Sequence, residues 1–339
     1  GTPVNGSRKR VLILGAGGRD FHDFNVVFRD DPDVEVVAIT AAQIPNIDNR
    51  SYPPALSGPN HPEGIPIRPQ AELEQLVAEH EVDEVVVSYS DLAHDDVMHL
   101  VSRCLATGAD VRFLGPAETM LTSDTPVIAV VASRTGVGKS QTSRHLGRLL
   151  TEAGLTVALV RHPMPYGELE PMRVQRFATL AEIDDADPTI EEREEYEEPV
   201  RQGLVIYAGV DYAAILERAG AEADVVIWDG GNNDTSFFQP ELTICLVDAL
   251  RPGHELEYHP GEVNLRMADI VVINKVDSAD AEALTEIRTN IAAVNPDATV
   301  IEARSPVMLD PGPDLAGARV LVVEDGPTVT HGGMPFGAG

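Results

Sequence analysis

One stretch of the sequence has the residue types and the spacing needed to bind phosphate groups. It runs from Ser133 to Ser140 (SRTGVGKS), between an apolar run typical of a buried strand and a run typical of a helix. Glycines let backbone N–H groups converge on phosphate oxygens, and a helix N-terminus adds partial positive charge. Ser133 replaces the usual first glycine. We predict a P-loop that binds a nucleoside triphosphate through Arg134, Thr135, Gly136, Val137, Gly138, Lys139, Ser140 and Gln141.

A carboxylate is expected beside this loop. Asp229 ends the apolar run DVVIWD and is followed by Gly230-Gly231-Asn232-Asn233-Asp234. A carboxylate at the end of a strand next to the P-loop strand is where Mg²⁺ coordination is needed, so Ser140 and Asp229 are the predicted metal ligands. The alternative is an aspartate that caps a turn. Lys139 and Asp229 are predicted to be catalytic as well.

The segment Asn274-Lys275-Val276-Asp277 follows another apolar run and resembles the NKxD motif with which GTPases read guanine. In that motif the aspartate accepts hydrogen bonds from the base, and the lysine stem packs on the ring. We predict that Asn274, Lys275 and Asp277 bind the nucleotide. A helix cap at Asp277 and Ser278 explains the same residues, so ATP and GTP both remain open as co-substrates.

A second glycine-rich turn, Gly15 to Asp20, follows the first apolar run. It lacks the third glycine of a dinucleotide fingerprint, and the next strand ends at Thr40, where a ribose-binding acid is expected. Binding of NAD is therefore disfavoured. The loop is better suited to a small anionic ligand, bound by Gly17, Arg19 and His22.

Further cationic side chains follow strand-like runs, on the side where α/β proteins bind ligands. Arginine suits bidentate binding of phosphate or carboxylate, although each of these residues alone fits a structural salt bridge. We predict catalytic roles for Arg161 and His162, and substrate-binding roles for Arg251, His254 and His331.

The elements that position these residues form two alternating series. In the first, strands are expected at 11–14, 34–40, 84–88 and 111–114, and helices around 70–80 and 94–106. In the second, strands are expected at 127–133, 157–160, 224–229, 242–248, 270–275, 299–303 and 319–324, and helices at about 139–153, 211–220 and 280–294. Residues 116–126 carry the breakers of a linker, and the acidic run 191–198 is interpreted as a solvated helix face. The fold class is therefore α/β: an N-terminal Rossmann-like parallel-sheet domain (1–124), then a P-loop NTPase α/β domain (125–339).

Composition limits the partners. The 339 residues include 55 Asp and Glu against 25 Lys and Arg, a formal net charge of −30. This argues against nucleic acid and anionic membranes, which require clustered basic residues. The scarcity of lysine suggests a halophilic source, whose salt would screen the self-repulsion. With two distant cysteines, no apolar run of membrane-spanning length and no signal-peptide core, a cytoplasmic location is expected.

Long blocks of the sequence resemble the cyclic 2,3-diphosphoglycerate synthetase family from about residue 10 to the last residue. They include GAGGRDFHDFN, SYSDLAHDDVMH, SRTGVGKSQTSR, WDGGNNDTSFFQPEL and VEDGPTVTHGGMPFGAG. The resemblance implies an archaeal, Mg²⁺-dependent enzyme that uses ATP to close a small anionic phosphorylated metabolite into a cyclic phosphoanhydride. Members of that family extend further at the C-terminus, so we expect a final segment to be missing here.

Two other functions fit the same motifs. A regulatory or chaperone GTPase is favoured by NKVD and disfavoured by the Arg and His clusters. An NTP-dependent ligase or kinase acting on another anionic metabolite would keep the same residues. A homodimer is compatible with each reading.

Overall fold

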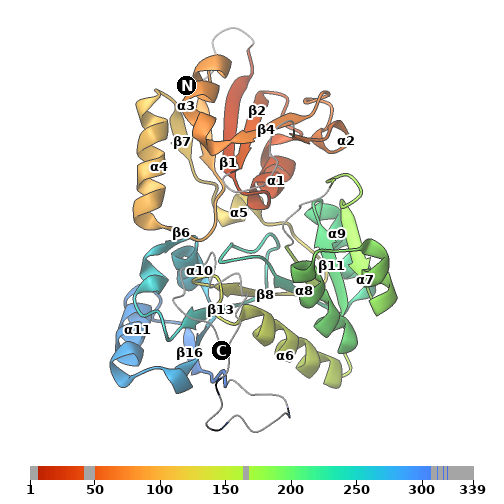
Figure 1. The fold of residues 1–339 in the computed structure, drawn as a ribbon, viewed down its shortest axis with the longest axis vertical. Coiled ribbons are helices and arrows are strands. Elements are labelled where there is room, and N and C mark those ends of the chain that lie inside the picture. Colours follow the sequence, from red (N-terminus) through yellow and green to blue (C-terminus); the bar gives the residue numbers. More distant parts are fainter. Residues whose placement is uncertain are drawn as a thin grey trace.

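Two α/β units follow one another along the chain (Figure 1). The computed structural model describes residues 7–41, 50–162 and 168–306, together with residues 311, 316 and 319. The first unit is built on a six-stranded sheet and the second on an eight-stranded sheet, as the α/β fold class predicted from the sequence requires. No helix within the described ranges is long and apolar enough to cross a membrane.

The sheet of the first unit is parallel except at one edge, where β3 runs antiparallel to β4. Its strands, in spatial order, are β3 (Ser51–Tyr52), β4 (Ile65–Pro69), β2 (Val34–Ala41), β1 (Lys9–Gly15), β5 (Glu84–Val87) and β7 (Asp110–Arg112). The helices are α1 (Arg19–Asp23), η1 (Phe24–Phe28), α2 (Pro54–Ser57), η2 (Gln70–Glu72), α3 (Leu73–His80), α4 (His94–Ala106) and α5 (Pro116–Thr119).

The sheet of the second unit is also parallel apart from its edge strand β10. Its strands, in spatial order, are β10 (Val174–Phe177), β11 (Val205–Gly209), β9 (Val157–Arg161), β12 (Val225–Asp229), β8 (Val127–Ala132), β13 (Leu242–Asp248), β15 (Ile270–Asn274) and β16 (Thr299–Glu302). The helices are α6 (Lys139–Glu152), α7 (Leu180–Ala186), α8 (Ile190–Arg201), α9 (Tyr212–Glu222), η3 (His254–Leu256), α10 (Gly261–Met267), η4 (Val276–Ser278) and α11 (Ala281–Val294).

The central strand β8 shows why this sheet is covered on both faces. Alternate side chains of a strand point to opposite sides. Accordingly Val127, Ala129 and Val131 join the apolar core that contains residues of α9, α10 and α11, while Val130 and Ala132 join the core that receives α6. A strand buried on both faces reads as a continuous apolar run, as VIAVVA does.

Some elements differ from the sequence expectation. Strands β10 and β11 and helix α7 were not anticipated, and the expected linker contains the short helix α5. The acidic run lies in α8, where several glutamates are exposed but Tyr196 is buried. Glu195 pairs with Arg161 at 3.5 Å, so the run is more than a solvated face. Residues 320–324, part of an expected strand, lie outside the described residues, and the boundary at 124/125 stays a prediction.

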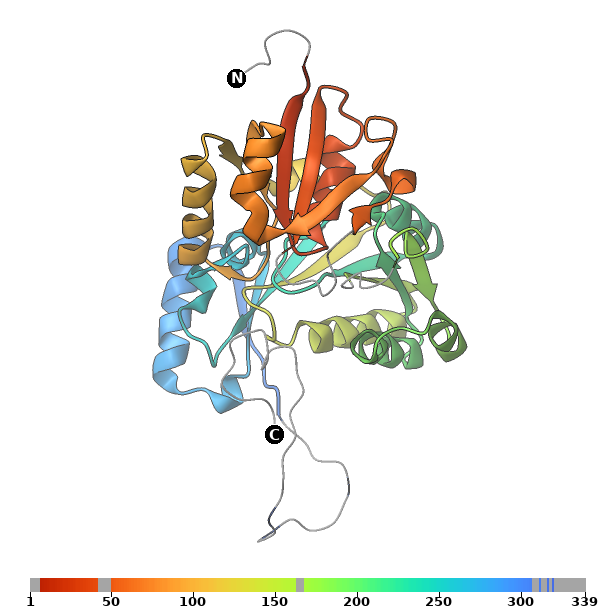
Figure 2. The same ribbon diagram turned by 45° about the horizontal axis from the view of Figure 1, so that its top comes forward.

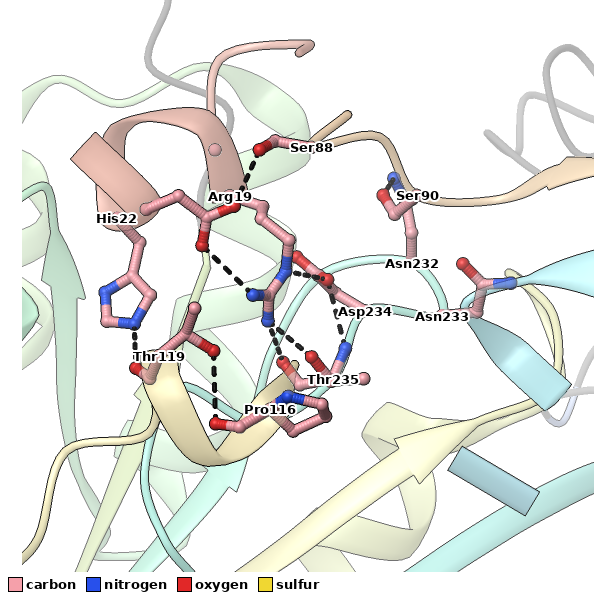
Figure 3. A network of polar contacts seen from close by, with 12 residues as sticks. Arg19, His22, Ser88, Ser90, Pro116, Thr119, Asn232, Asn233, Asp234 and Thr235 are labelled. Atoms are coloured by element: carbon pink, nitrogen blue, oxygen red, sulfur yellow. Dashed lines mark hydrogen bonds and ion pairs between the residues drawn. The ribbon is translucent and has the colours of Figure 1, made fainter. Parts of the chain in front are cut away.

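The two units meet through the loops that follow their central strands (Figures 1 and 2). Strands β6 (Leu92–Ala93) and β14 (Tyr258–His259), one from each side, pair as a short antiparallel ribbon. Arg19, after β1, donates through Nε to Asp234 Oδ1 (2.5 Å) and through Nη2 to Thr235 O (2.8 Å) (Figure 3). Arg19 also pairs with Asp23 at 3.2 Å. The carboxyl ends of both sheets therefore face one another.

Replacing Arg19 by Gln should destabilise the protein strongly. It would leave Asp23 and Asp234, whose side chains are only 2% and 3% exposed, without their cation, and a broken buried pair costs about 3–5 kcal/mol of unfolding free energy. Burial already raises the pKa of Asp23 to about 7, so the loss should be largest near pH 8 and smaller near pH 5, where Asp23 is protonated in the folded state.

Urea unfolding of the Arg19→Gln variant at both pH values checks this expectation. Arg103→Gln is the matched control, because Arg103 pairs with Glu74 on the surface, where both side chains are more than 40% exposed. The control should lose no more than about 1 kcal/mol. Equal losses in the two variants would contradict a structural role for the Arg19 pairs.

Candidate nucleotide-binding and active site

The predicted P-loop connects β8 to α6. Strand β8 lies between β12 and β13, so residues at the ends of both neighbours can reach the loop. Gly136 and Gly138 have φ values of +76° and +99°, and α6 begins directly after Gly138. Lys139 and Ser140 thus occupy the first turn of a helix, at its partially positive end.

The carbonyl groups of the loop are held by side chains from other elements. A peptide group is planar and trans, so fixing one residue's C=O turns the next residue's N–H the opposite way. Anchoring the carbonyls therefore leaves the following amides available for phosphate. The donors are Asn233 Nδ2 to Ser133 O (3.1 Å), Arg251 Nη2 to Thr135 O (2.6 Å), Lys275 Nζ to Gly136 O (3.0 Å) and Asn274 Nδ2 to Val137 O (2.9 Å).

Asp229, at the end of β12, lies where the sequence places it. Its carboxylate is fully buried; Oδ2 accepts from Arg161 Nη1 at 2.5 Å, and Oδ1 lies 3.4 Å from Lys139 Nζ. Arg161 also donates to Ser140 Oγ at 3.1 Å. Lys139 donates to the carbonyls of Gly230 and Asn232. Burial lowers the pKa of Lys139 and thus disfavours its charged form, whereas the neighbouring Asp229 carboxylate acts in the opposite direction.

The two predicted metal ligands, Ser140 and Asp229, are both bound by Arg161, and their binding of Mg²⁺ stays a prediction. Asp229 Oδ1 is buried and has no hydrogen-bond partner, and Ser140 offers a second hard oxygen nearby. The described part of the chain has no group of three or more His, Cys, Asp or Glu side chains placed to hold a metal.

The segment Asn274–Asp277, which the sequence predicts to read the base, lies against the P-loop. Asn274 and Lys275 supply two of the carbonyl anchors, and Lys275 Nζ also pairs with Asp248 at 3.1 Å. Asp277 Oδ1 accepts from the backbone N–H of Ser305 at 3.1 Å. The Ser305 hydroxyl reaches Gln141 Oε1 on α6 at 3.5 Å. The structure therefore brings together predicted nucleotide residues that lie up to 139 positions apart in the sequence.

The predicted substrate residues of the first unit lie at the junction between the units. Gly17 donates its N–H to Asp20 Oδ2 (3.1 Å), which shapes the turn that carries Arg19. His22 is buried, stacks on Phe237 with ring centroids 3.9 Å apart, and contacts Thr119 O through Nε2 at 2.8 Å. Burial holds the pKa of His22 well below its ordinary value. Its position indicates packing between the units, and its predicted substrate contact stays a prediction.

Of the remaining cationic residues, Arg251 and His254 contact P-loop residues, and His162 lies beside Gly18 at the junction between the units. Arg251 Nε donates to Asp248 Oδ2 (2.9 Å), and His254 Nδ1 lies 2.9 Å from Arg134 Nη1. Burial lowers the pKa of His162 to about 4, so its ring is neutral. That ring lies so close to Gly18 that a Cβ there would be 2.0 Å from its Cε1. His331 lies outside the described residues.

Sequence reasoning missed Asp91 and Asn264, two side chains that organise this site, and it expected Asn233 to position water or substrate. Asp91 binds the P-loop from the first unit. Asn233 anchors Ser133, and Asn264 of α10 donates to Ala132 O (3.1 Å) and to the carbonyls of Asn233 and Asp234. Asp91 comes shortly after strand β5, and Asn233 comes shortly after β12. A polar residue near the end of a strand was the signal used to select Asp229, and it could have found Asp91 as well. Asn264 lies inside a helix and carries no such signal.

The fold and the site define a P-loop protein of the α/β class with a nucleotide-binding domain. A model of the CobW/HypB/UreG nucleotide-binding domain matches residues 191–302, which include β12 and the segment Asn274–Asp277. Arginine synthetase ArcE of Thermococcus kodakarensis is 57% identical over 332 residues, covering 98% of this chain and 74% of that protein. The chain therefore belongs to the family of arginine synthetase ArcE.

Solved structures resemble the chain only remotely. LpxK from Aquifex aeolicus in complex with ATP is 17% identical, covers 52% of this chain and 54% of its own, and has a TM-score of 0.33. A DUF1611 family protein from Anabaena variabilis is 11% identical, covers 87% of this chain and 95% of its own, and has a TM-score of 0.31. Scores this low support no functional assignment.

Replacing Gly138 by Ala should abolish nucleotide binding. The new Cβ would lie 2.4 Å from Asn274 Nδ2, which would break the anchor on Val137 O and shift the loop. Gly154→Ala is the matched control, because Gly154 also has a positive φ of +90° but has nothing within 4 Å of an added Cβ. Titration with a fluorescent, non-hydrolysable nucleotide should show binding in the control alone. Normal binding by Gly138→Ala would refute the proposed geometry of the loop.

Proposed function

We propose that the protein is an NTP-dependent synthetase that forms the guanidinium group of arginine. The observation that carries this proposal is 57% identity to arginine synthetase ArcE across 98% of the chain, a span that includes both units. The P-loop, the buried Asp229 and the segment Asn274–Asp277 support the nucleotide-dependent part. The junction between the carboxyl ends of the two sheets is the natural place for the second substrate.

Elementary chemistry suggests the course of such a reaction. A ureido oxygen is a poor leaving group, and transfer of the γ-phosphoryl group to it converts it into a phosphate ester. Ammonia then attacks the ureido carbon, the C–O bond breaks, and inorganic phosphate leaves with a proton lost by the nucleophile. The net result is a guanidinium, a nucleoside diphosphate and phosphate.

Each proposed step has candidate residues. Lys139 and the loop amides would hold the β- and γ-phosphates, and Ser140 and Asp229 would hold Mg²⁺, which would neutralise phosphate charge. Arg161 bridges Ser140 and Asp229, so it is placed to stabilise the transferring group. The neutral ring of His162 can accept a hydrogen bond from the nucleophile, but a pKa of about 4 makes it a weak base.

The charge of the site favours a zwitterionic acceptor over a polyanion. Arg19 faces Asp23 and Asp234, Arg161 faces Asp229, and Arg251 faces Asp248. Burial lowers the pKa of both His22 and His162, so neither ring adds positive charge at neutral pH. Little uncompensated positive charge is left among these residues for a substrate with several phosphates.

Cyclic 2,3-diphosphoglycerate synthesis is the second candidate. It rests on the sequence blocks quoted above, which span the chain, and it would use the same γ-phosphoryl transfer, with a substrate phosphate as acceptor. Attack by the second phosphate would then expel inorganic phosphate and close the ring. A GTPase that acts on protein partners is the third candidate, and it rests on Asn274-Lys275-Val276-Asp277.

One assay separates the three functions. Purified protein in high salt with Mg²⁺ is given ATP or GTP, together with a ureido amino acid and ammonium, with 2,3-diphosphoglycerate, or with neither. We expect phosphate release and arginine only with the ureido amino acid and ammonium. Phosphate release stimulated by diphosphoglycerate would favour synthesis of the cyclic phosphoanhydride. Phosphate release that is the same with and without either acceptor would favour the GTPase.

Replacing Asp277 by Asn tests base selection. If Asp277 reads guanine, the affinity for GTP should fall about ten-fold or more while the affinity for ATP stays close to wild type, because only guanine offers two N–H donors to that carboxylate. Asp280→Asn, in the N-terminal cap of α11, is the control. An unchanged preference in Asp277→Asn would remove the case for guanine.

A further inference from the structure

We propose that Asp91, in the first unit, is a positioning residue for the nucleotide loop of the second. The inference rests on the proposed nucleotide-dependent function, and it adds that the N-terminal unit determines the shape of the P-loop. Asp91 is not proposed to touch the nucleotide. It acts through Arg134 and Thr135, the second and third residues of the loop.

The contacts of Asp91 hold two consecutive loop residues at once. Its Oδ1 accepts from Arg134 Nε at 3.0 Å, and its Oδ2 accepts from Arg134 Nη2 at 3.1 Å. Oδ1 also accepts from the backbone N–H of Thr135 at 3.3 Å. A bidentate carboxylate fixes the plane of a guanidinium as well as its distance. A residue of the first unit thereby fixes the position of the Arg134 side chain and of the Thr135 backbone in the P-loop.

The far side of Arg134 is equally constrained. Its guanidinium lies 3.6 Å from the centre of the Tyr258 ring, and its Nη1 lies 2.9 Å from His254 Nδ1. Tyr258 belongs to β14, which pairs with β6 immediately after Asp91. The same ribbon that joins the two units therefore encloses the Arg134–Asp91 pair, and the Arg134 side chain is only 4% exposed.

The backbone of Asp91 supports this placement. Asp91 has a φ of +57°, a left-handed conformation that Asp and Asn tolerate better than most side chains. Its N–H donates to Asn233 Oδ1 at 2.6 Å, and the other end of that amide anchors Ser133 O. One short chain of contacts thus links the first unit, the loop after β12 and the start of the P-loop.

The loop that carries Asp91 also contacts the charged cluster around Arg19. Ser88 Oγ donates to Asp23 Oδ2 at 2.6 Å, and Asn232 Nδ2 donates to Ser90 Oγ at 3.2 Å; Figure 3 labels both serines and Asn232. Residues 88–91 therefore contact the Arg19 cluster, the loop after β12 and the P-loop. A ligand that shifts the Arg19 cluster would therefore also shift residues 88–91, and through Asp91 it would change the position of the P-loop.

The variant Asp91→Asn separates positioning from simple charge repulsion, because the two effects have opposite signs. Asn keeps the tolerance for a left-handed backbone but loses the bidentate anchor of Arg134. If Asp91 positions the loop, the affinity for a non-hydrolysable nucleotide should fall about ten-fold, the scale of one charge-assisted contact. The nucleotide KM should rise while kcat changes little. If Asp91 only repelled phosphate, binding would tighten, and the inference would be overturned.

Two further variants keep the test decisive. Asp96→Asn makes the same chemical change at an exposed position in the first turn of α4 and should bind like the wild type. Arg134→Gln should weaken binding as much as Asp91→Asn, and the double variant should be no weaker than the worse single one, because the pair acts as a unit. Fully additive losses, or unchanged affinity in a folded Asp91→Asn, would refute the inference. A wild type that binds no nucleotide would instead refute the proposed function.

Discussion

The P-loop keeps its shape because side chains from elsewhere hold its carbonyl groups. Four of these carbonyls are bound by Asn233, Arg251, Lys275 and Asn274. These four residues lie at or just after the carboxyl ends of strands β12, β13 and β15. Each anchor turns the following amide the other way. The phosphate-binding property therefore depends on residues up to about 140 positions away in the sequence. It does not arise from the glycines alone, because they allow unusual backbone angles but do not determine where the amide N–H groups point.

This constraint explains several residues that look like ligand contacts in the sequence. Arg251 and Lys275 are cationic and follow strands, which suits a phosphate or base contact. In the structure both donate to carbonyl oxygens of the P-loop. Both also form an ion pair with Asp248. A buried cation that holds a backbone carbonyl needs a carboxylate partner to offset its loss of hydration. Asp248 meets that need, and the pairing explains why positive charge gathers here without forming an open anionic site.

The sequence predicted the fold class, and it placed a glycine loop between strand β8 and helix α6, because both features depend on local patterns. Apolar runs alternating with helical runs define a parallel sheet, and a strand, a glycine loop and a helix in succession define the phosphate site. The contacts of Arg19 with Asp234 and of Asp91 with Arg134 join residues 215 and 43 positions apart. No local pattern specifies which strand end will meet which. Asn264 is harder still, because its three carbonyl acceptors exist only once the loops are in place.

The pairing of charges also decides how the site can attract a nucleotide. The chain has a formal net charge of −30, and its buried arginines at the junction are matched by aspartates. Long-range attraction of a nucleoside triphosphate by side-chain charge is therefore weak, particularly in salt. The favourable energy has to come at short range, from oriented amides, the N-terminus of α6 and Lys139. Short-range hydrogen bonds fall off steeply with misalignment, so a protein that relies on them gains most from fixing the loop in advance. The anchors on the loop carbonyls and the hold of Asp91 on Arg134 and Thr135 provide that fixed geometry.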